Sequence, residues 1–169
     1  MPINWFSLVV GHSELTILPM QPEDIPDILE LEAETLSAWS RKQLEDELEQ
    51  PTGFQFVVRR EGSEKIQAVL CVRIIADEAE ILKLRVAEHV RKKGVGTQLL
   101  DFVLKFCGDK GVKNCFLELR ASNAAARSLY EKKGFFMVGS RKDYYEEPVE
   151  DAILMRLELE FPSKNEIMK

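Results

Sequence analysis

The spacing of apolar residues along the chain predicts a succession of strands and helices. Short apolar or alternating runs bounded by turn residues predict strands. These strands cover residues 15–20, 54–59, 67–75, 80–86, 115–119, 135–141 and 152–159. Apolar positions three and four residues apart predict helices. These helices cover residues 23–34, 41–48, 94–106 and 123–132.

Two further signals concern the N-terminal half. Ser40 is suited to cap helix 41–48, and Gln43, three residues later, completes a capping box. The run from Trp5 to Val10 predicts another strand, because it is too short for a signal-peptide core and lacks a basic segment before it. We expect this strand to extend one edge of the sheet, with a contact between two copies of the chain as the alternative.

The order of these elements predicts an α/β fold. Strand 80–86, helix 94–106 and strand 115–119 form a strand–helix–strand unit, which implies a parallel pair with a right-handed crossover. The other connections favour antiparallel pairing, so we expect a mixed sheet with helices on both faces. With 169 residues the chain has room for one domain. We place it at 15–160, after an extension over 1–14 and before a polar tail over 161–169.

Composition narrows the class of protein. The chain has 29 acidic and 23 basic residues, a formal charge of -6, and 45 % of its residues are hydrophobic. A sizeable core excludes wholesale disorder, and the acidic balance argues against a protein that coats nucleic acid. The longest apolar runs reach about six residues, far short of the ~20 that cross a bilayer. We therefore expect a cytoplasmic protein that binds neither nucleic acid directly nor a membrane.

The cysteines and histidines do not indicate a metal centre. They are Cys71, Cys107, Cys115, His12 and His89, and none shows the paired spacing of a structural zinc site. Cys107 and Cys115 lie in apolar contexts, so we expect buried, reduced thiols.

A basic turn before helix 94–106 is the first candidate for chemistry. Its sequence is R-K-K-G-V-G, from Arg91 to Gly96. Glycines allow a close backbone approach, and the unpaired N–H groups of a helix start attract an anion such as a phosphate. A solvated basic turn without a ligand is the alternative.

Two residues later in the chain could handle protons. Glu118 lies in the apolar strand that follows the crossover helix, where a carboxylate can act as a general base. A strand glutamate that faces solvent is the alternative. Tyr130, on the next helix, could donate a proton, although a tyrosine at helical spacing is commonly a core residue. Asn123 or Ser122 could cap that helix.

Five segments in this order resemble the GCN5-related N-acetyltransferase (GNAT) superfamily, and within it the bacterial ribosomal-protein-alanine N-acetyltransferases (RimI-type). They read E-A-E-T-L-S-A-W-S at 32–40, D-E-A-E-I-L-K-L-R-V at 77–86, R-K-K-G-V-G at 91–96, L-E-L-R-A-S-N-A-A-A-R-S-L-Y-E-K-K-G-F-F at 117–136 and R-K-D-Y-Y-E-E-P-V-E-D-A-I-L-M at 141–155. The resemblance implies a single-domain α/β fold. Its mostly antiparallel sheet would contain a central parallel strand pair splayed for acetyl-CoA.

The resemblance also implies roles for individual residues. Glu118 would be the general base and Tyr130 the general acid, without a metal. Contacts to acetyl-CoA would come from the following residues: Leu84, Arg85, Val86, Lys92, Lys93, Gly94, Val95, Gly96, Thr97 and Asn123. The backbone of 84–86 would pair with the pantetheine arm and polarise the thioester carbonyl. The turn 92–97 would hold the pyrophosphate.

The chain departs from the resemblance on β-strand 80–86. Relatives often carry N-I-A-V where this chain has Lys83, Leu84, Arg85 and Val86. Lys83 and Arg85 alternate away from Leu84 and place positive charge either beside the cleft or on the opposite face. The backbone role of the strand should survive this change.

The acceptor groove is expected between the first two helices and the loop before the last strand. Trp39, Tyr144 and Tyr145 could form its walls, although Trp39 could equally be a core residue. Residues 22–50 contain ten acidic and two basic side chains, and residues 141–151 contain five and two. These acidic walls could attract a basic protein N-terminus. A solvated helix face is the alternative for 22–50.

The resemblance therefore implies an enzyme that acetylates the α-amino group of a protein N-terminus, with the N-terminal alanine of a ribosomal protein as the expected acceptor. The alternatives are an acetyltransferase for a small amine or a lysine side chain, and a non-catalytic acyl-CoA-binding module. We expect a monomer or a weak dimer.

Overall fold

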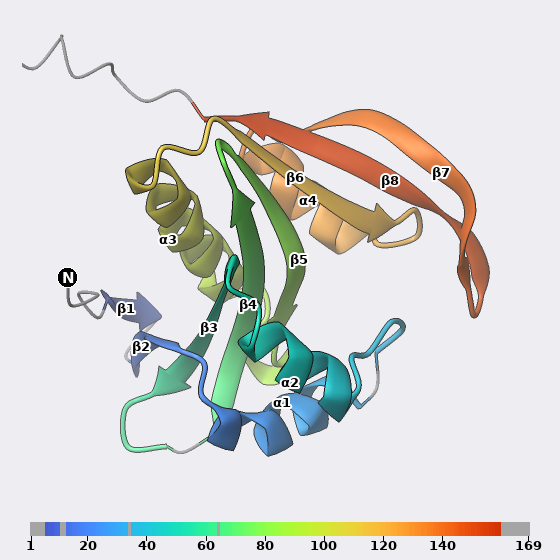
Figure 1. Ribbon diagram of the computed structural model, residues 1–169. Helices are drawn as coiled ribbons and strands as arrows, with labels where there is room; N and C mark the ends of the chain where they lie inside the picture. The colour runs from blue at the N-terminus through green and yellow to red at the C-terminus, as the bar shows by residue number, and fades with distance from the viewer. Residues whose placement is uncertain (1–5, 11–12, 34, 64, 160–169) are drawn as a thin grey trace, which may run out of the picture. The chain divides into compact units, whose positions relative to one another are not determined.

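The computed structural model describes residues 6–10, 13–33, 35–63 and 65–159 (Figure 1). The expected polar tail at 161–169 and part of the expected extension at 1–14 lie outside these residues. The chain divides into two compact units, which are described separately. The first unit comprises residues 1–73 and 81–102, and the second comprises 74–80 and 103–169.

The first unit is built on five strands. They are β1 (Phe6–Val10), β2 (Ser13–Pro19), β3 (Gly53–Arg60), β4 (Ile66–Ile75) and β5 (Glu78–Val86), and they lie in this order in the sheet. The pairings β1–β2, β2–β3 and β3–β4 are antiparallel. A strand therefore forms where the run from Trp5 to Val10 predicts one, and it pairs with β2 at the end of this strand order.

Two short helices cover the core of the first unit. They are α1 (Ile25–Glu32), which follows a 3-10 turn over Pro22–Asp24, and α2 (Arg41–Leu48). Their apolar side chains pack with those of β3 and β4 in one buried cluster, made of Met20, Ile25, Ile28, Leu44, Val57, Ile66, Val69 and Cys71. The predicted capping box is present, because Gln43 N donates to Ser40 Oγ at 3.2 Å and Ser40 N donates to Gln43 Oε1 at 2.8 Å.

A second 3-10 turn, η2 (Glu88–Val90), leads from β5 to the basic turn and then to α3 (Val95–Asp109). The apolar face of α3 is buried, as its spacing predicts; Val95, Leu99, Leu100, Val103 and Cys107 are at most 1 % exposed. None of the helices within the described residues has the length and apolar character needed to span a bilayer.

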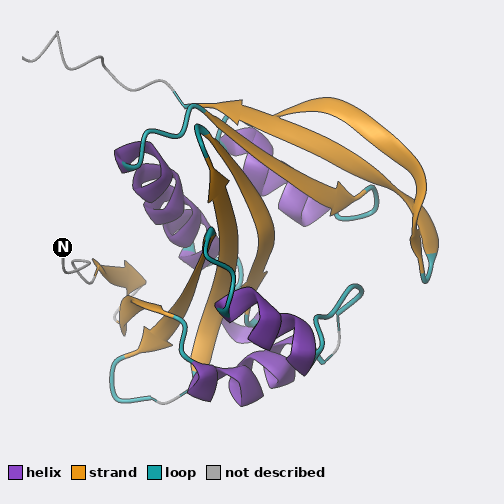
Figure 2. Ribbon diagram, viewed as in Figure 1, coloured by secondary structure: helices purple, strands orange, loops and turns teal. Residues whose placement is uncertain are grey.

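The second unit contains three antiparallel strands and a helix. The strands β6 (Asn114–Arg120), β8 (Val149–Glu158) and β7 (Phe136–Glu146) lie in the order β6-β8-β7. The helix α4 (Ala124–Lys132) connects β6 to β7 (Figure 2). Tyr130 and Phe135 close its C-terminal end with an edge-on ring contact at 5.4 Å between centroids.

The expected polar loop between the last two strands is wrong. The sequence predicts a connection over residues 142–151, but β7 extends to Glu146 and β8 begins at Val149, so the two form a long hairpin. Hydrogen-bonded backbone pairing sustains a strand without apolar alternation. The residues of this hairpin are mostly polar, so the sequence shows no apolar pattern that would predict its strands. The pairing also shifts register between Arg141 and Tyr145, where Asp143 has a left-handed conformation, and this shift interrupts the alternation of side chains.

All three cysteines are buried and free, as predicted. Burial raises the pKa of the Cys71 and Cys107 thiols to about 12, and it also raises that of Cys115. Within the described part of the chain, His, Cys, Asp and Glu residues form no group of three suited to hold a metal ion.

Candidate functional site

The basic turn of the first unit has the geometry of an anion site. Lys92 and Gly94 both adopt left-handed backbone conformations, with φ of 58° and 86°. Arg91, Lys92 and Lys93 are exposed, and Arg91 Nε donates to the carbonyl of Val86 at 3.0 Å. The turn is therefore bent sharply and anchored to the end of β5.

The start of α3 supplies donors at the same place. Its first intrahelical bond runs from Gln98 N to Gly94 O at 3.0 Å. The N–H groups of Val95, Gly96 and Thr97 precede this bond, so the helix itself provides no acceptors for them. Three amides beside three cations suit a pyrophosphate such as that of acetyl-CoA.

The end of β5 approaches α1 through alternate side chains. Lys83 Nζ lies 2.6 Å from Glu32 Oε2, and Arg85 Nε donates to the carbonyl of Leu31 at 3.3 Å. Both basic side chains therefore face α1. Leu84 and Val86 alternate with them and are half-buried.

Trp39 lies in the connection between α1 and α2. The Trp39 side chain packs against the buried cluster of the first unit, and the backbone N–H of Trp39 donates to Glu32 Oε2 at 2.7 Å. The interpretation of Trp39 as a core residue is thus correct in part, because one side of the indole is packed while the residue remains partly exposed.

Glu118 lies on the less buried face of β6 in the second unit. Its neighbours Leu117 and Leu119 point into the core, whereas the Glu118 side chain is 21 % exposed. Its Oε1 lies 3.0 Å from a guanidinium nitrogen of Arg141 on β7. The interpretation of Glu118 as a solvated strand residue is therefore incomplete, because this carboxylate is partly enclosed and holds a cation.

Tyr130 is buried, with 6 % of its surface exposed. Burial raises the pKa of its phenol, and the nearby Cys115 thiol raises it further, so the group keeps its proton at neutral pH. Cys115 belongs to the buried face of β6, which is the face opposite to Glu118.

Asn123 is the cap of α4. Its Oδ1 accepts from Ala126 N at 3.1 Å, which decides between Asn123 and Ser122. Ser122 instead donates through its backbone N–H and its hydroxyl to Glu150, at 3.0 and 3.1 Å.

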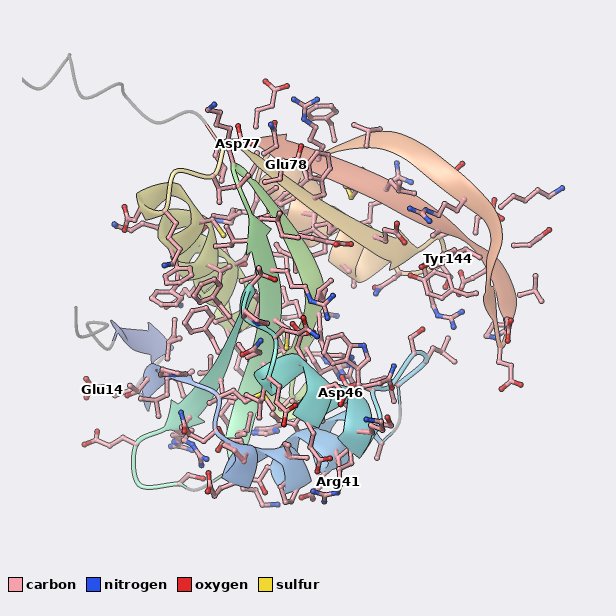
Figure 3. The ribbon with its side chains drawn as sticks, viewed as in Figure 1. Glu14, Arg41, Asp46, Asp77, Glu78 and Tyr144 are labelled. Atoms are coloured by element: carbon pink, nitrogen blue, oxygen red, sulfur yellow. The ribbon has the colours of Figure 1, made fainter. Side chains whose placement is uncertain are left out.

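The two tyrosines of β7 take part in a network that sequence reasoning did not find. Tyr144, labelled in Figure 3, lies with its ring centroid 5.1 Å from that of Tyr145. Arg120 stacks over the Tyr145 ring at 4.1 Å, and its guanidinium lies 2.8 Å from Glu150 Oε1. Arg141 stacks over the Tyr144 ring at 5.4 Å.

Electrostatics links this network to Glu118. Burial raises the pKa of Tyr145, and the negative charge of Glu118 adds to this rise. The spacing of Glu118 and Arg120, two residues apart on one strand, places them on the same face and is the signal that could have revealed the network.

The acidic segment 22–50 is less available than its composition suggests. Asp24, Glu32 and Glu47 are buried, and each forms an ion pair with a basic residue of a strand. The pairs are Asp24–Arg59, Glu32–Lys83 and Glu47–Arg73. Exposed pairs such as Lys42–Asp46, at 2.9 Å, occupy further acids. These ion pairs weaken the expectation of an acidic wall at 22–50.

The chain resembles a known family over most of its length. The model of the acetyltransferase (GNAT) family matches residues 25–135. The ribosomal protein bS18-alanine N-acetyltransferase of Escherichia coli (strain K12) is 32 % identical over 146 residues, 84 % of this chain and 96 % of that relative. Its Salmonella typhimurium counterpart is 35 % identical over 98 residues, 57 % of this chain and 66 % of that relative.

A solved structure shows the same likeness. The crystal structure of the ribosomal-protein-S18-alanine N-acetyltransferase from Escherichia coli has a TM-score of 0.80 and 30 % identity, and the match covers 89 % of this chain and 97 % of that one. The predicted α/β fold, with a mostly antiparallel sheet that contains one parallel strand pair, is thereby confirmed.

Proposed function

The chain belongs to the acetyltransferase (GNAT) family and is an acetyl-CoA-dependent N-acetyltransferase, and we propose that its acceptor is a protein N-terminus that begins with alanine. Relatives named for this activity on ribosomal protein bS18 align with more than four-fifths of the chain at about one-third identity, which supports a ribosomal protein as the acceptor. The two tyrosines next to Glu118 support a peptide groove in the second unit.

We assign the binding of acetyl-CoA to two segments of the first unit and one residue of the second. The amides and cations of Lys92, Lys93, Gly94, Val95, Gly96 and Thr97 would hold the pyrophosphate. The backbone of Leu84, Arg85 and Val86 would pair with the pantetheine arm. Asn123 uses its Oδ1 for the helix cap, so its amide N–H groups would face the cofactor. Acetyl-CoA supplies an acetyl group that is activated as a thioester.

Glu118 carries the proposal for catalysis. An α-ammonium group has a pKa of about 8 and must lose a proton before its nitrogen can attack a carbonyl. The Glu118 carboxylate already holds the cationic guanidinium of Arg141 at 3.0 Å, so it is suited to receive an ammonium group at the same place. It would accept the ammonium proton, directly or through water, while the new N–C bond forms.

Tyr130 would complete the proton balance. As the C–S bond breaks, the departing thiolate takes a proton from the phenol, which burial keeps protonated. The nitrogen loses a second proton as the amide forms, and this proton restores the neutral phenol through solvent. General acid and general base catalysis each contribute roughly 10²–10⁴-fold to a rate. Trp39 in the first unit, and Tyr144 and Tyr145 in the second, are each proposed to contact the acceptor.

Turnover of acetyl-CoA against a panel of hexapeptides tests the acceptor. The panel contains a basic peptide that begins with alanine, a neutral peptide that begins with alanine, and a peptide with a blocked N-terminus and a free lysine. We expect the first to be the preferred substrate. Turnover confined to the lysine peptide or to small amines would overturn the proposed acceptor, and acetyl-CoA binding without any turnover would indicate a non-catalytic module.

A further inference from the structure

Glu32 is a buried carboxylate that joins two segments of the first unit. Its side chain is 2 % exposed, and Oε2 accepts from Lys83 Nζ at 2.6 Å and from Trp39 N at 2.7 Å. Removing a carboxylate from water is costly unless donors satisfy it. The structure therefore places β5 and the connection between α1 and α2 around one shared acceptor.

Lys83 extends this arrangement to the indole of Trp39. The Lys83 side chain is 9 % exposed, and its Nζ lies 4.8 Å from the centroid of the Trp39 ring. An ammonium group within about 6 Å of an aromatic face is attracted to it, most strongly for tryptophan. One ammonium group thus contacts both the carboxylate and the ring, so the position of the ring depends on Lys83.

Arg85 makes a second connection between the same elements. It lies two residues after Lys83 on the same face of β5, and its Nε donates to the carbonyl of Leu31 at 3.3 Å. These two contacts lie on either side of Leu84, which belongs to the strand segment assigned above to the pantetheine arm. They hold the end of α1 against β5 at that segment, and Trp39 lies in the connection that follows α1.

We propose that Glu32 and Lys83 are positioning residues that hold the indole of Trp39 beside β5 and thereby restrict the acceptor to a small first side chain. This inference rests on the proposed function, in which Trp39 contacts the acceptor. A rigid wall rejects a larger side chain because the pocket cannot yield, whereas a mobile indole would admit it.

The chain offers a matched control for this role. Glu47 on α2 is also buried, at 3 % exposure, and is ion-paired with Arg73 on β4. Glu32→Gln/Lys83→Met and Glu47→Gln/Arg73→Met each replace one buried ion pair of the first unit by neutral side chains of similar length. A purely structural role of Glu32 and Lys83 would make the two double variants behave alike.

The experiment compares basic hexapeptides that begin with alanine or leucine and are otherwise identical. For Glu32→Gln/Lys83→Met we expect the ratio of kcat/KM for the two peptides to fall about tenfold, through a higher KM for the alanine peptide and a gain on the leucine peptide. The KM for acetyl-CoA should not change. The control double variant should keep the ratio of the unmodified chain.

A spectroscopic readout reports on the indole itself. The chain has two tryptophans, so Trp5→Phe leaves Trp39 as the single source of indole fluorescence. In that background, loss of Lys83 should shift the emission of Trp39, and loss of Arg73 should not. If Glu32→Gln/Lys83→Met does not fold, Lys83→Arg takes its place. This variant keeps the charge but replaces a compact ammonium by a larger planar group. We expect the same fall in the peptide ratio and the same shift of the Trp39 emission.

The outcomes separate this inference from the proposed function. An unchanged peptide ratio in a folded Glu32→Gln/Lys83→Met variant, or an equal fall in the control, would overturn the inference while the proposed acceptor stands. If the unmodified chain acetylated no peptide N-terminus, the proposed function would fail and the inference would fail with it.

Discussion

The carboxylate of Glu118 on β6 meets the guanidinium of Arg141 on β7 at 3.0 Å, across the intervening strand β8. In the strand register Arg141 lies opposite Ala152, and Ala152 lies opposite Arg120. Directly paired residues of antiparallel strands share a face, so Arg141, Ala152 and Arg120 lie on the same face. Because the Ala152 side chain is small, it leaves room for the longer side chains of Glu118 and Arg141 to meet above it. This network presents two carboxylates, from Glu118 and Glu150, together with two guanidinium groups and two tyrosine rings.

Removing the Glu118 carboxylate should slow the reaction without unfolding the chain. We expect Glu118→Gln to lower kcat roughly 10²–10⁴-fold, because the amide cannot accept the ammonium proton. Steady-state kinetics with an alanine peptide measures this. Glu158→Gln removes another carboxylate from the strands of the second unit, one that pairs with Arg156 at 2.8 Å, and should leave kcat unchanged. Full activity of Glu118→Gln would show that another group takes the proton.

Tyr130 tests the other half of the proton balance. Tyr130→Phe should lower kcat by about 10²-fold, because the thiolate loses its proton donor. Its KM for the peptide should stay the same, since the ring and its contact with Phe135 are kept. Because burial raises the pKa of Tyr130, kcat of the unmodified enzyme should show no loss of this acid below pH 10. Equal kcat values for the two proteins would refute the assignment.

The basic turn can be tested with two glycines that have the same backbone conformation. Gly94 and Gly62 adopt φ of +86° and +71°, and a Cβ atom would meet nothing closer than 3.6 Å at either position. Alanine therefore costs about 1–2 kcal/mol at each through left-handed strain alone. Gly94→Ala should raise the KM for acetyl-CoA, whereas Gly62→Ala, in the β3–β4 connection, should lower stability to a similar extent and leave that KM unchanged. A similar KM for both variants would remove the turn from cofactor binding.

Much of the fold could be predicted from the sequence, whereas most of the ion pairs could not. Apolar periodicity locates the helices because each buries one face, and the capping box at Ser40 is a local signal. The buried acids Asp24, Glu32 and Glu47 look the same in sequence as their exposed neighbours. Their partners lie 35, 51 and 26 residues away, so only the strand order brings them together.

The candidate site shows the same division. Glu118 and Tyr130 could be proposed from a resemblance and from their elements, but the partners of Glu118 could not. Tyr145 lies in the stretch 142–151 that the sequence predicts to be a loop, and a loop has no fixed register. Arg141 is the last residue of the strand predicted before it, so its partners across the sheet depend on the same missing pairing. Once β7 and β8 are known to pair, the alternation of side chains places Arg141 and Arg120 on the face of Glu118.

Stability should fall at alkaline pH because buried groups resist ionisation. The pKa of Cys71 and of Cys107 is raised from 9.0 to about 12, and that of Tyr130 is raised as well. Above pH 9 the unfolded chain releases thiol protons that the folded chain retains, so the free energy of unfolding decreases with pH until about 12. Each thiol contributes a slope of at most about 1.4 kcal/mol per pH unit.

Urea unfolding at pH 8, 9.5 and 10.5 measures this slope, and Cys71→Ala provides the comparison. The variant should be less stable at pH 8, since it leaves a small cavity in the cluster of the first unit, but its slope above pH 9 should be shallower. Parallel slopes for the two proteins would mean that the Cys71 thiol ionises in the folded state as readily as in the unfolded one.

Arg120 should control the peptide side of the reaction through the hairpin of β7 and β8. Its side chain is 11 % exposed, and it donates to the carbonyls of Glu147 and Pro148, both at 3.2 Å, in addition to Glu150 and the Tyr145 ring. Arg120→Met removes all four interactions at once and keeps an unbranched apolar stem. We expect the KM for the alanine peptide to rise about tenfold while the KM for acetyl-CoA stays constant, because only the two tyrosines lose the contacts that hold them.

Arg156 on β8 donates to Asn114 at 3.1 Å in the same sheet, away from the tyrosines, so Arg156→Met is the matched control. If both variants changed the peptide KM equally, the effect would belong to the stability of the sheet, and Arg120 would have no particular role in shaping the groove.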